Sequence, residues 1–129
     1  MKIKTIKHKG QALVETALLL PIMLMLIFGI IEFGLILNTN IVVSNASREG
    51  ARYASLGYTD SEVKTLVNNE TSTLTIKETK INYENKGTDD ENVEVIVTCS
   101  YKLITPIVGN LISESGTFDI KSSTKMRVE

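Results

Sequence analysis

The sequence predicts an α+β protein in which one long N-terminal helix packs on a small antiparallel β-sheet of about three strands. An apolar run of 26 residues extends from Ala12 to Leu37, which is long enough for a helix whose whole surface is apolar. Three segments further along the chain alternate apolar and polar residues, as strands with one buried face do. Since the helix and the sheet each have an apolar face to bury, they are natural partners, and 129 residues suffice for one such domain.

The apolar run is predicted to cross a membrane. As a helix it would be about 39 Å long against a hydrocarbon thickness of about 30 Å, so one tilted or protruding transmembrane helix is expected over residues 11–37. Glu15 and Glu32 are the charged residues in the run from Ala12 to Leu37. A carboxylate well inside a bilayer helix costs about 2.5–3.5 kcal/mol, so each glutamate needs either a shallow position or a partner.

The distribution of charge predicts the orientation. Four of the 14 basic residues precede the helix, and none of the 15 acidic residues does. The positive-inside rule therefore places the N-terminus in the cytoplasm and the rest of the chain outside, although Arg48 and Arg52 weakly oppose this. A chain that began at Gln11 would have a formal charge of −5, because all four of those lysines would be lost. The outer part of the chain is thus acidic.

The helix is expected to continue outside the membrane over residues 38–57. Apolar residues recur there at helical spacing, and Gly57 is predicted to end the helix near Leu56. Three small residues spaced four apart form a stripe that permits close backbone approach: Ala46, Gly50 and Ala54. This stripe packs either on the chain's own sheet or on the helix of another subunit, and we favour its own sheet.

Residues 58–129 are expected to form a small extracytoplasmic α+β domain. Asp60-Ser61-Glu62 is predicted to cap a short helix that Asn68-Asn69 closes. A polar turn is expected over residues 84–92. A short apolar helix or loop is expected from Pro106 to Ile112, between the last two strands.

Strands are predicted over Thr71–Tyr83, Val93–Ile104 and Thr117–Val128. The middle strand alternates most clearly, and its apolar face comprises Val93, Val95, Val97, Cys99, Tyr101 and Leu103. In the last strand, Ser122 and Thr124 share a face with the apolar residues Phe118, Ile120, Met126 and Val128. Each strand therefore has one face to bury, and the outer half of the long helix is its expected partner.

No catalytic residue is predicted. The single histidine, His8, precedes the apolar helix, which leaves the outer domain without a histidine-based triad or the usual histidine metal site. Cys99 is the only cysteine, so it cannot form an internal disulfide, and we interpret it as a small buried hydrophobe. Asp89-Asp90-Glu91 lacks the ligand spacing of a calcium loop, which favours a solvated turn over a calcium site. We expect a protein that is not an enzyme and has no cofactor, metal or small-molecule substrate.

The chain also lacks glycine-rich phosphate-binding motifs, and its acidic outer part argues against nucleic acid as a partner.

Three interpretations of the N-terminus remain. A cleaved secretory signal fits poorly, because its apolar core is 7–15 residues long. An uncleaved signal anchor fits the length and the charge bias, but leaves the placement of Gly10 and Glu15 to chance. The third interpretation is a prepilin-type leader.

The leader and the helix resemble those of type IV pilins and pseudopilins. Those proteins have a short basic leader that ends in glycine, an apolar helix, and a glutamate at the fifth position after the glycine. Gly10, the run that follows it and Glu15 match this pattern, with residues 1–10 as the leader. More narrowly, three segments resemble the TadE-like family, the pseudopilins of the tight-adherence (Flp) pilus system: GQALVETALLLP from Gly10, GIIEFG from Gly29 and ASREGARYA from Ala46.

The resemblance implies a minor pilin-like subunit in the cytoplasmic membrane, cleaved by a prepilin peptidase between Gly10 and Gln11 and assembled through its apolar helix. It implies as partners membrane lipid, other pseudopilins, the major Flp pilin and the proteins of the assembly platform. After processing, the subunit would be associated with the pilus. The alternative is an uncleaved, single-pass membrane protein whose outer domain binds an extracellular ligand.

Two residues of the helix are candidates for assembly contacts. In a bundle of parallel helices, Glu15 can pair with the amine that cleavage creates at Gln11 of a neighbouring subunit, and we favour this over a solvated position at the inner lipid boundary. For Glu32 we favour the opposite interpretation, a residue wetted by headgroups at the outer boundary. Pro21 removes a helical hydrogen bond and bends the helix. In pilin-like proteins a proline in this region accompanies local unwinding during assembly.

Overall fold

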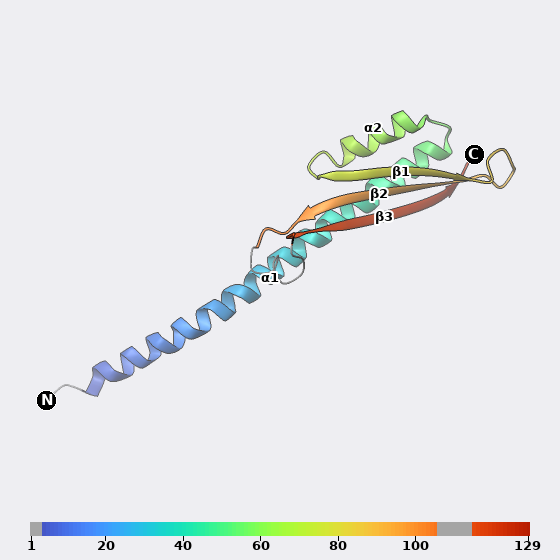
Figure 1. Cartoon of the computed structure of the whole chain (residues 1–129). Helices are drawn as coiled ribbons and strands as arrows, with labels where there is room; N and C mark the ends of the chain where they lie inside the picture. The colour runs from blue at the N-terminus through green and yellow to red at the C-terminus, as the bar shows by residue number, and fades with distance from the viewer. Residues whose placement is uncertain (1–3, 106–114) are drawn as a thin grey trace.

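The computed structural model describes residues 4–105 and 115–129, with side chains described from Gly10 onward. Helix α1 (Lys4–Ser55) is 52 residues long and forms the axis of the molecule. Its C-terminal half carries a three-stranded sheet and a second helix, whereas its N-terminal half projects alone (Figure 1). The predicted α+β arrangement of a long apolar helix on a three-stranded antiparallel sheet is confirmed.

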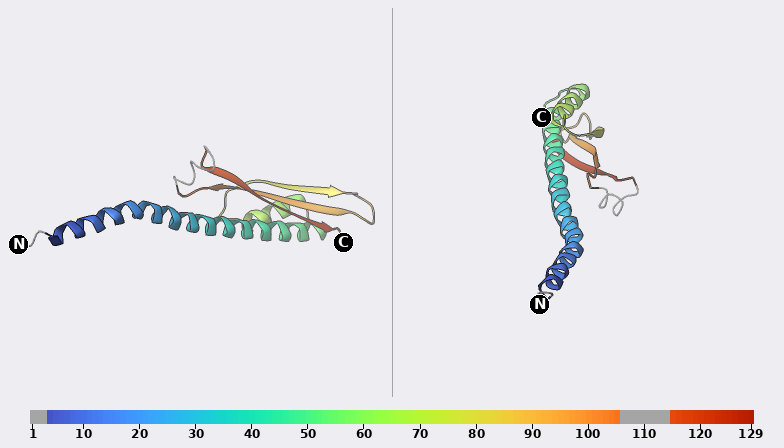
Figure 2. Two further views of the ribbon diagram at one scale, coloured as in Figure 1. Left: turned by 90° about the horizontal axis from the view of Figure 1, so that it is seen from below. Right: turned by 90° about the vertical axis from the view of Figure 1, so that its left-hand side faces the viewer.

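Helix α1 is continuous through Pro21. Figure 2 shows a bend in the N-terminal part of this helix, as expected for a helix that contains an internal proline. At the other end, the N–H of Tyr58 donates to the carbonyl of Tyr53 and the N–H of Gly57 to that of Ala54, the two bonds of a Schellman cap. Gly57 has φ of 86°, a conformation that favours glycine, so its predicted role at the end of the helix is confirmed.

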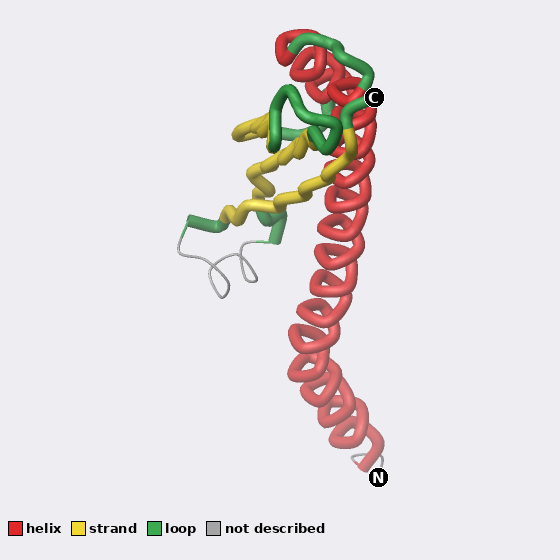
Figure 3. The backbone as a smooth tube through the Cα atoms, turned by 90° about the vertical axis from the view of Figure 1, so that its right-hand side faces the viewer, coloured by secondary structure: helices red, strands yellow, loops and turns green. Residues whose placement is uncertain are grey.

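The sheet is a simple antiparallel meander in the order β1-β2-β3 (Ile76–Glu84, Asn92–Lys102 and Thr117–Arg127). Its central strand, β2, buries every second side chain, which confirms the face predicted from Val93 to Leu103. All three strands lie on the same side of α1 (Figure 3). The predicted segment from Pro106 to Ile112 lies outside the described residues.

Helix α2 (Asp60–Glu70) packs beside the C-terminal end of α1. The prediction that Asp60 begins its cap was wrong by one residue, because Thr59 is the N-cap. The Thr59 hydroxyl accepts from the N–H of Glu62, and the Glu62 carboxylate accepts from the N–H of Thr59 at 2.9 Å. These bonds form a capping box, and the backbone bond is the main cause that lowers the pKa of Glu62. Thr71, predicted to begin a strand, instead caps the end of α2.

The core lies between the C-terminal half of α1, α2 and the inner face of the sheet. It is built mostly from valine and alanine, and Cys99 is 1% exposed within it, as expected of a small buried hydrophobe. Burial raises the pKa of the Cys99 thiol, which keeps it protonated. The buried members of the core are Val43, Ala46, Ala51, Ala54, Val63, Val67, Val93, Val95, Val97 and Cys99.

Candidate functional site

The N-terminal half of α1 presents an apolar surface that nothing in the described chain covers. Of its most apolar stretch, only 6% is buried, and the mean hydropathy there is 2.5. The 21 residues from Gln11 to Ile31 would span about 31 Å, close to the hydrocarbon thickness of a bilayer. This length and composition indicate that the helix anchors the protein in a membrane.

Gly10, Gln11 and Glu15 lie together on this exposed helix. With Val14 and Leu18 they line one shallow hollow on its surface. Gln11 and Glu15 are one helical turn apart, so their side chains occupy the same face. Within the described part of the chain, the Glu15 carboxylate has no hydrogen bond and no ion pair. It is therefore available to a group from another molecule.

Glu32 is held very differently from Glu15. Its side chain is only 2% exposed. Oε1 accepts from the Tyr101 hydroxyl at 2.9 Å and from the N–H of Ile104 at 3.2 Å. Oε2 accepts from the N–H of Thr105 at 3.0 Å and from the Thr105 hydroxyl at 3.0 Å. Four donors from the end of β2 and the residues just beyond it thus enclose one carboxylate of α1.

The expectation that headgroups solvate Glu32 was therefore wrong. The protein itself supplies the polar partners that a carboxylate at the end of an apolar run requires, which offsets the loss of hydration. Tyr101 shares in this arrangement, because its burial, and secondarily its bond to Glu32, raises the pKa of Tyr101 to about 12. The ring of Tyr101 also packs against Phe118 of β3 with 5.5 Å between the ring centroids. Glu32 thereby ties the sheet to the helix at the start of their contact.

The small residues of α1 face the chain's own domain. Ala46 and Ala54 are buried, and Gly50 lies so close to α2 and β2 that a Cβ atom there would be 3.0 Å from Val67 and 3.2 Å from Val95. Of the two alternatives for this stripe, the structure shows packing on the chain's own domain. On the other side of the same helix, Arg48 and Arg52 are exposed.

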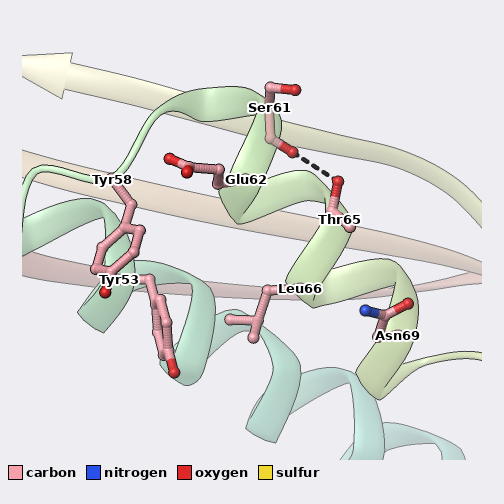
Figure 4. A pocket seen from close by; sticks show the side chains of 7 residues that line it. All are labelled: Tyr53, Tyr58, Ser61, Glu62, Thr65, Leu66 and Asn69. Atoms are coloured by element: carbon pink, nitrogen blue, oxygen red, sulfur yellow. Dashed lines mark hydrogen bonds between the residues drawn. The ribbon is translucent and has the colours of Figure 1, made fainter.

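A second shallow hollow lies at the far end of the domain, between the end of α1 and α2. Figure 4 shows its lining side chains, with Tyr53 and Tyr58 on one side and those of α2 on the other. The two tyrosine rings are 5.0 Å apart. The Glu62 carboxylate is engaged in the capping box, and the Thr65 hydroxyl donates to the carbonyl of Ser61 at 2.9 Å. The polar groups of this hollow thus mainly stabilise α2.

The acidic group of the turn between β1 and β2 is also used structurally. The Glu91 carboxylate accepts from the N–H of Gly87 at 2.8 Å, and Asp90 lies 3.5 Å from the guanidinium of Arg127. Among the residues that the structure describes, no three acidic, cysteine or histidine side chains gather as metal ligands would. Glu91 and Asp90 of this acidic group thus have partners within the chain itself.

Comparison with known proteins bears on the helix rather than on the sheet. The family model described as TadE-like protein matches residues 10–52. This segment is TadE-like. It begins at Gly10, contains Glu15, Pro21 and Glu32, and ends three residues before the end of α1. The match confirms the resemblance and supports a protein associated with the tight-adherence pilus. Neither a curated protein nor a solved structure matches the chain.

Proposed function

We propose that this protein is a minor pilin-like subunit of the tight-adherence pilus, which a prepilin peptidase cleaves after Gly10 and which assembles through its apolar helix. The observation that supports this most is the TadE-like helix itself, whose residues from Gly10 to Ile31 are exposed almost throughout. An apolar surface of this length needs lipid or other helices around it. In the proposed function, the bilayer surrounds this surface before assembly, and neighbouring subunits surround it afterwards.

Cleavage creates the partner of Glu15. Cutting the bond between Gly10 and Gln11 leaves a positively charged amine at the end of the helix, one turn from Glu15 on the same face. In a bundle of parallel helices, the amine of one subunit pairs with the Glu15 carboxylate of its neighbour and sets the axial stagger between them. Other pseudopilins and the major pilin are the proposed neighbours, and the assembly platform extracts the helix from the membrane.

The basic leader sets the orientation in this proposal, with the N-terminus in the cytoplasm and the sheet domain outside the cytoplasmic membrane. We propose further that the protein acts by packing rather than by catalysis. Its buried polar residues support this, because Glu32 is bound by structural donors, and Ser47 bonds to Thr124 at 2.8 Å to join α1 to β3. In this proposal neither a small molecule nor nucleic acid is a partner.

The alternative is an uncleaved anchor whose sheet binds an extracellular ligand. The outer face of the sheet gives this alternative little support. Its charged side chains pair with each other, as Lys77 does with Asp119 at 2.7 Å and Lys125 with Glu84. The central strand places one apolar residue on this face, Ile96, between Lys80 and Ser123. A single isoleucine among charged and polar side chains is smaller than the apolar core of a typical binding surface.

The mass of the mature protein tests the proposal. When the chain is co-expressed with its cognate prepilin peptidase, we expect intact-mass spectrometry to find a protein that begins at Gln11. The Gly10→Ala variant should keep the leader, whereas Gly29→Ala, which also places a methyl group in open space on α1, should be processed normally. A wild-type protein that retains residues 1–10 under these conditions would favour the uncleaved anchor.

A further inference from the structure

The position of Glu32 relative to the bilayer follows from the length of α1. This step depends on the proposed function, in which the helix from Gln11 crosses the membrane. The 21 residues up to Ile31 would span about 31 Å, and the hydrocarbon core is about 30 Å thick. Glu32 then lies where the hydrocarbon meets the outer headgroups.

The hydrogen bonds of Glu32 bring the end of the sheet to the same height. Its carboxylate accepts from the backbone N–H groups of Ile104 and Thr105, at 3.2 and 3.0 Å, and from the hydroxyl of Tyr101. Backbone donors leave little freedom, because they fix the chain itself rather than a flexible side chain. The residues just after β2 are thus fixed at the level of the outer interface.

The side chains exposed at this level suit an interface between lipid and water. Ile104 is 69% exposed, although it is a large apolar residue. Phe33, the next residue of α1 after Glu32, is 63% exposed and continues the apolar surface of the helix. Lys102 is also exposed and has a long stem that can place its ammonium among phosphates. Apolar side chains at the acyl boundary beside a lysine whose ammonium stays among the headgroups are typical of surfaces that bind lipid.

We infer that the membrane-proximal end of the sheet, held to α1 by Glu32, is a second lipid-contacting surface with Ile104 inserted into the outer headgroup region. A bilayer is the occupant that continuity favours, since this surface extends directly from the apolar face of the transmembrane helix. The contact adds a second point of attachment to the single helix. It fixes the tilt of the outer domain relative to the membrane before assembly.

Tryptophan fluorescence can test this contact, because the chain contains no tryptophan. Three single-tryptophan variants of the full-length protein are placed in phosphatidylcholine vesicles with bromine atoms either near the headgroup or deep in the acyl chains. Leu20→Trp reports on the transmembrane helix and Ile104→Trp on the proposed contact. Tyr58→Trp reports on the far end of the domain. Tyr58 lies just beyond the end of α1, and that end is about 35 Å from Glu32 along the helix. All three positions are exposed, so each variant is expected to fold.

We expect Leu20→Trp to lose most emission with deep bromines, Ile104→Trp to lose more with shallow than with deep bromines, and Tyr58→Trp to lose none. Adding Glu32→Gln to the Ile104→Trp variant should reduce its quenching. If Ile104→Trp is quenched no more than Tyr58→Trp while Leu20→Trp is quenched, the lipid contact is overturned and anchoring by the helix stands. A blue-shifted but unquenched Ile104→Trp would also overturn it, since the residue would then be buried against protein. An unquenched Leu20→Trp would overturn both membrane anchoring and this contact.

Discussion

At the scale of single residues, two glutamates in one apolar helix differ by the source of their partners. Glu32 accepts hydrogen bonds from four donors within the chain, whereas Glu15 is exposed and has no polar partner in the part of the chain that the structure describes. The cost of burying a carboxylate explains this difference, because a buried charge must be compensated at once by whatever surrounds it. Glu32 is a structural residue, whereas Glu15 is the carboxylate for which we propose an assembly contact.

Replacing Glu32 by glutamine should destabilise the outer domain. The amide keeps one acceptor but turns an NH₂ group toward backbone donors, which leaves buried N–H groups without a partner and costs about 1–3 kcal/mol. Urea denaturation of the detergent-solubilised protein measures this loss of unfolding free energy. Glu49→Gln is the matched control, because Glu49 is an exposed glutamate of the same helix, and it should change stability by less than about 0.5 kcal/mol. Equal stability of the two variants would contradict the role assigned to Glu32.

Tyr101 should ionise only in strongly alkaline solution. Its pKa is raised to about 12, mainly by burial and then by the bond to Glu32. Because the pKa of Tyr101 is higher in the folded than in the unfolded state, its contribution to the free energy of unfolding is complete below about pH 10, where an unfolded tyrosine ionises. That contribution is lost as the pH rises through 12. Absorbance at 295 nm should show one tyrosine that titrates near pH 12 in the folded wild type and is missing from folded Tyr101→Phe, while both proteins have the same number of tyrosines that titrate at lower pH. Glu32→Gln should lower this pKa only in part, because burial remains.

The sequence could not predict the arrangement around Glu32. Its donors lie 69 to 73 residues further along the chain, and two of them are backbone N–H groups, which every residue except proline has. No local pattern marks such a contact. Tyr101 was correctly placed on the inner face by alternation, but a hydroxyl on that face does not identify the residue it will reach. Glu15 stood out because its signal is local, at a fixed spacing from Gly10.

At the scale of elements, the contact of α1 with α2 and β2 depends on the absence of a side chain at Gly50. A Cβ atom there would meet Val67 at 3.0 Å and Val95 at 3.2 Å, both in a core of buried valines. Gly50→Ala should therefore destabilise the domain, because overpacking costs about 1–3 kcal/mol and the better helix propensity of alanine returns only about 1 kcal/mol.

Gly34→Ala is the control that measures helix propensity alone, because no atom lies within 4 Å of a Cβ added at Gly34. Thermal denaturation should show a lower midpoint for Gly50→Ala and an unchanged or higher midpoint for Gly34→Ala. If both variants shift the midpoint upward, the core tolerates a methyl group at Gly50 and the close approach is not tight.

Most elements could be predicted because their signals are local. Alternation in β2 and β3 specified which face is buried, and Gly57 marked the end of α1. The errors fell at boundaries. Thr59 caps α2 instead of Asp60, since both residue types suit an N-cap and only Thr59 lies three residues before Glu62. Strand β1 begins at Ile76 rather than Thr71, because the Thr71 hydroxyl bonds back to the carbonyl of Val67 within α2.

At the scale of the whole molecule, α1 is one helix with two environments. From Gly10 to Ile31 its surface is almost entirely exposed, and from Glu32 to Ser55 one side is covered by the chain's own domain. The sequence predicts a membrane-spanning segment that extends to Leu37, and the hydrogen bonds of Glu32 join this segment to the end of the sheet. Composition could not reveal this, because Leu35, Ile36 and Leu37 are apolar in either environment.

This division predicts that a change on the exposed half alters assembly without altering the fold. Glu15→Ala should leave thermal stability and cleavage after Gly10 unchanged, since Glu15 contacts no other part of the described domain and the leader is intact. In the assembled bundle, however, the new amine of a neighbouring subunit would lose its partner, at a cost of about 3–5 kcal/mol for an uncompensated buried charge.

Sheared pili and membranes, separated by centrifugation and probed for a tagged protein, measure the outcome. We expect processed Glu15→Ala to accumulate in membranes and to be depleted from pili. Glu49→Ala is the matched control, because Glu49 is an exposed glutamate of the same helix that lies outside the apolar run, and it should be incorporated normally. Normal incorporation of Glu15→Ala would show that the amine does not pair with this carboxylate, and that packing of the apolar surfaces alone determines the stagger of the helices.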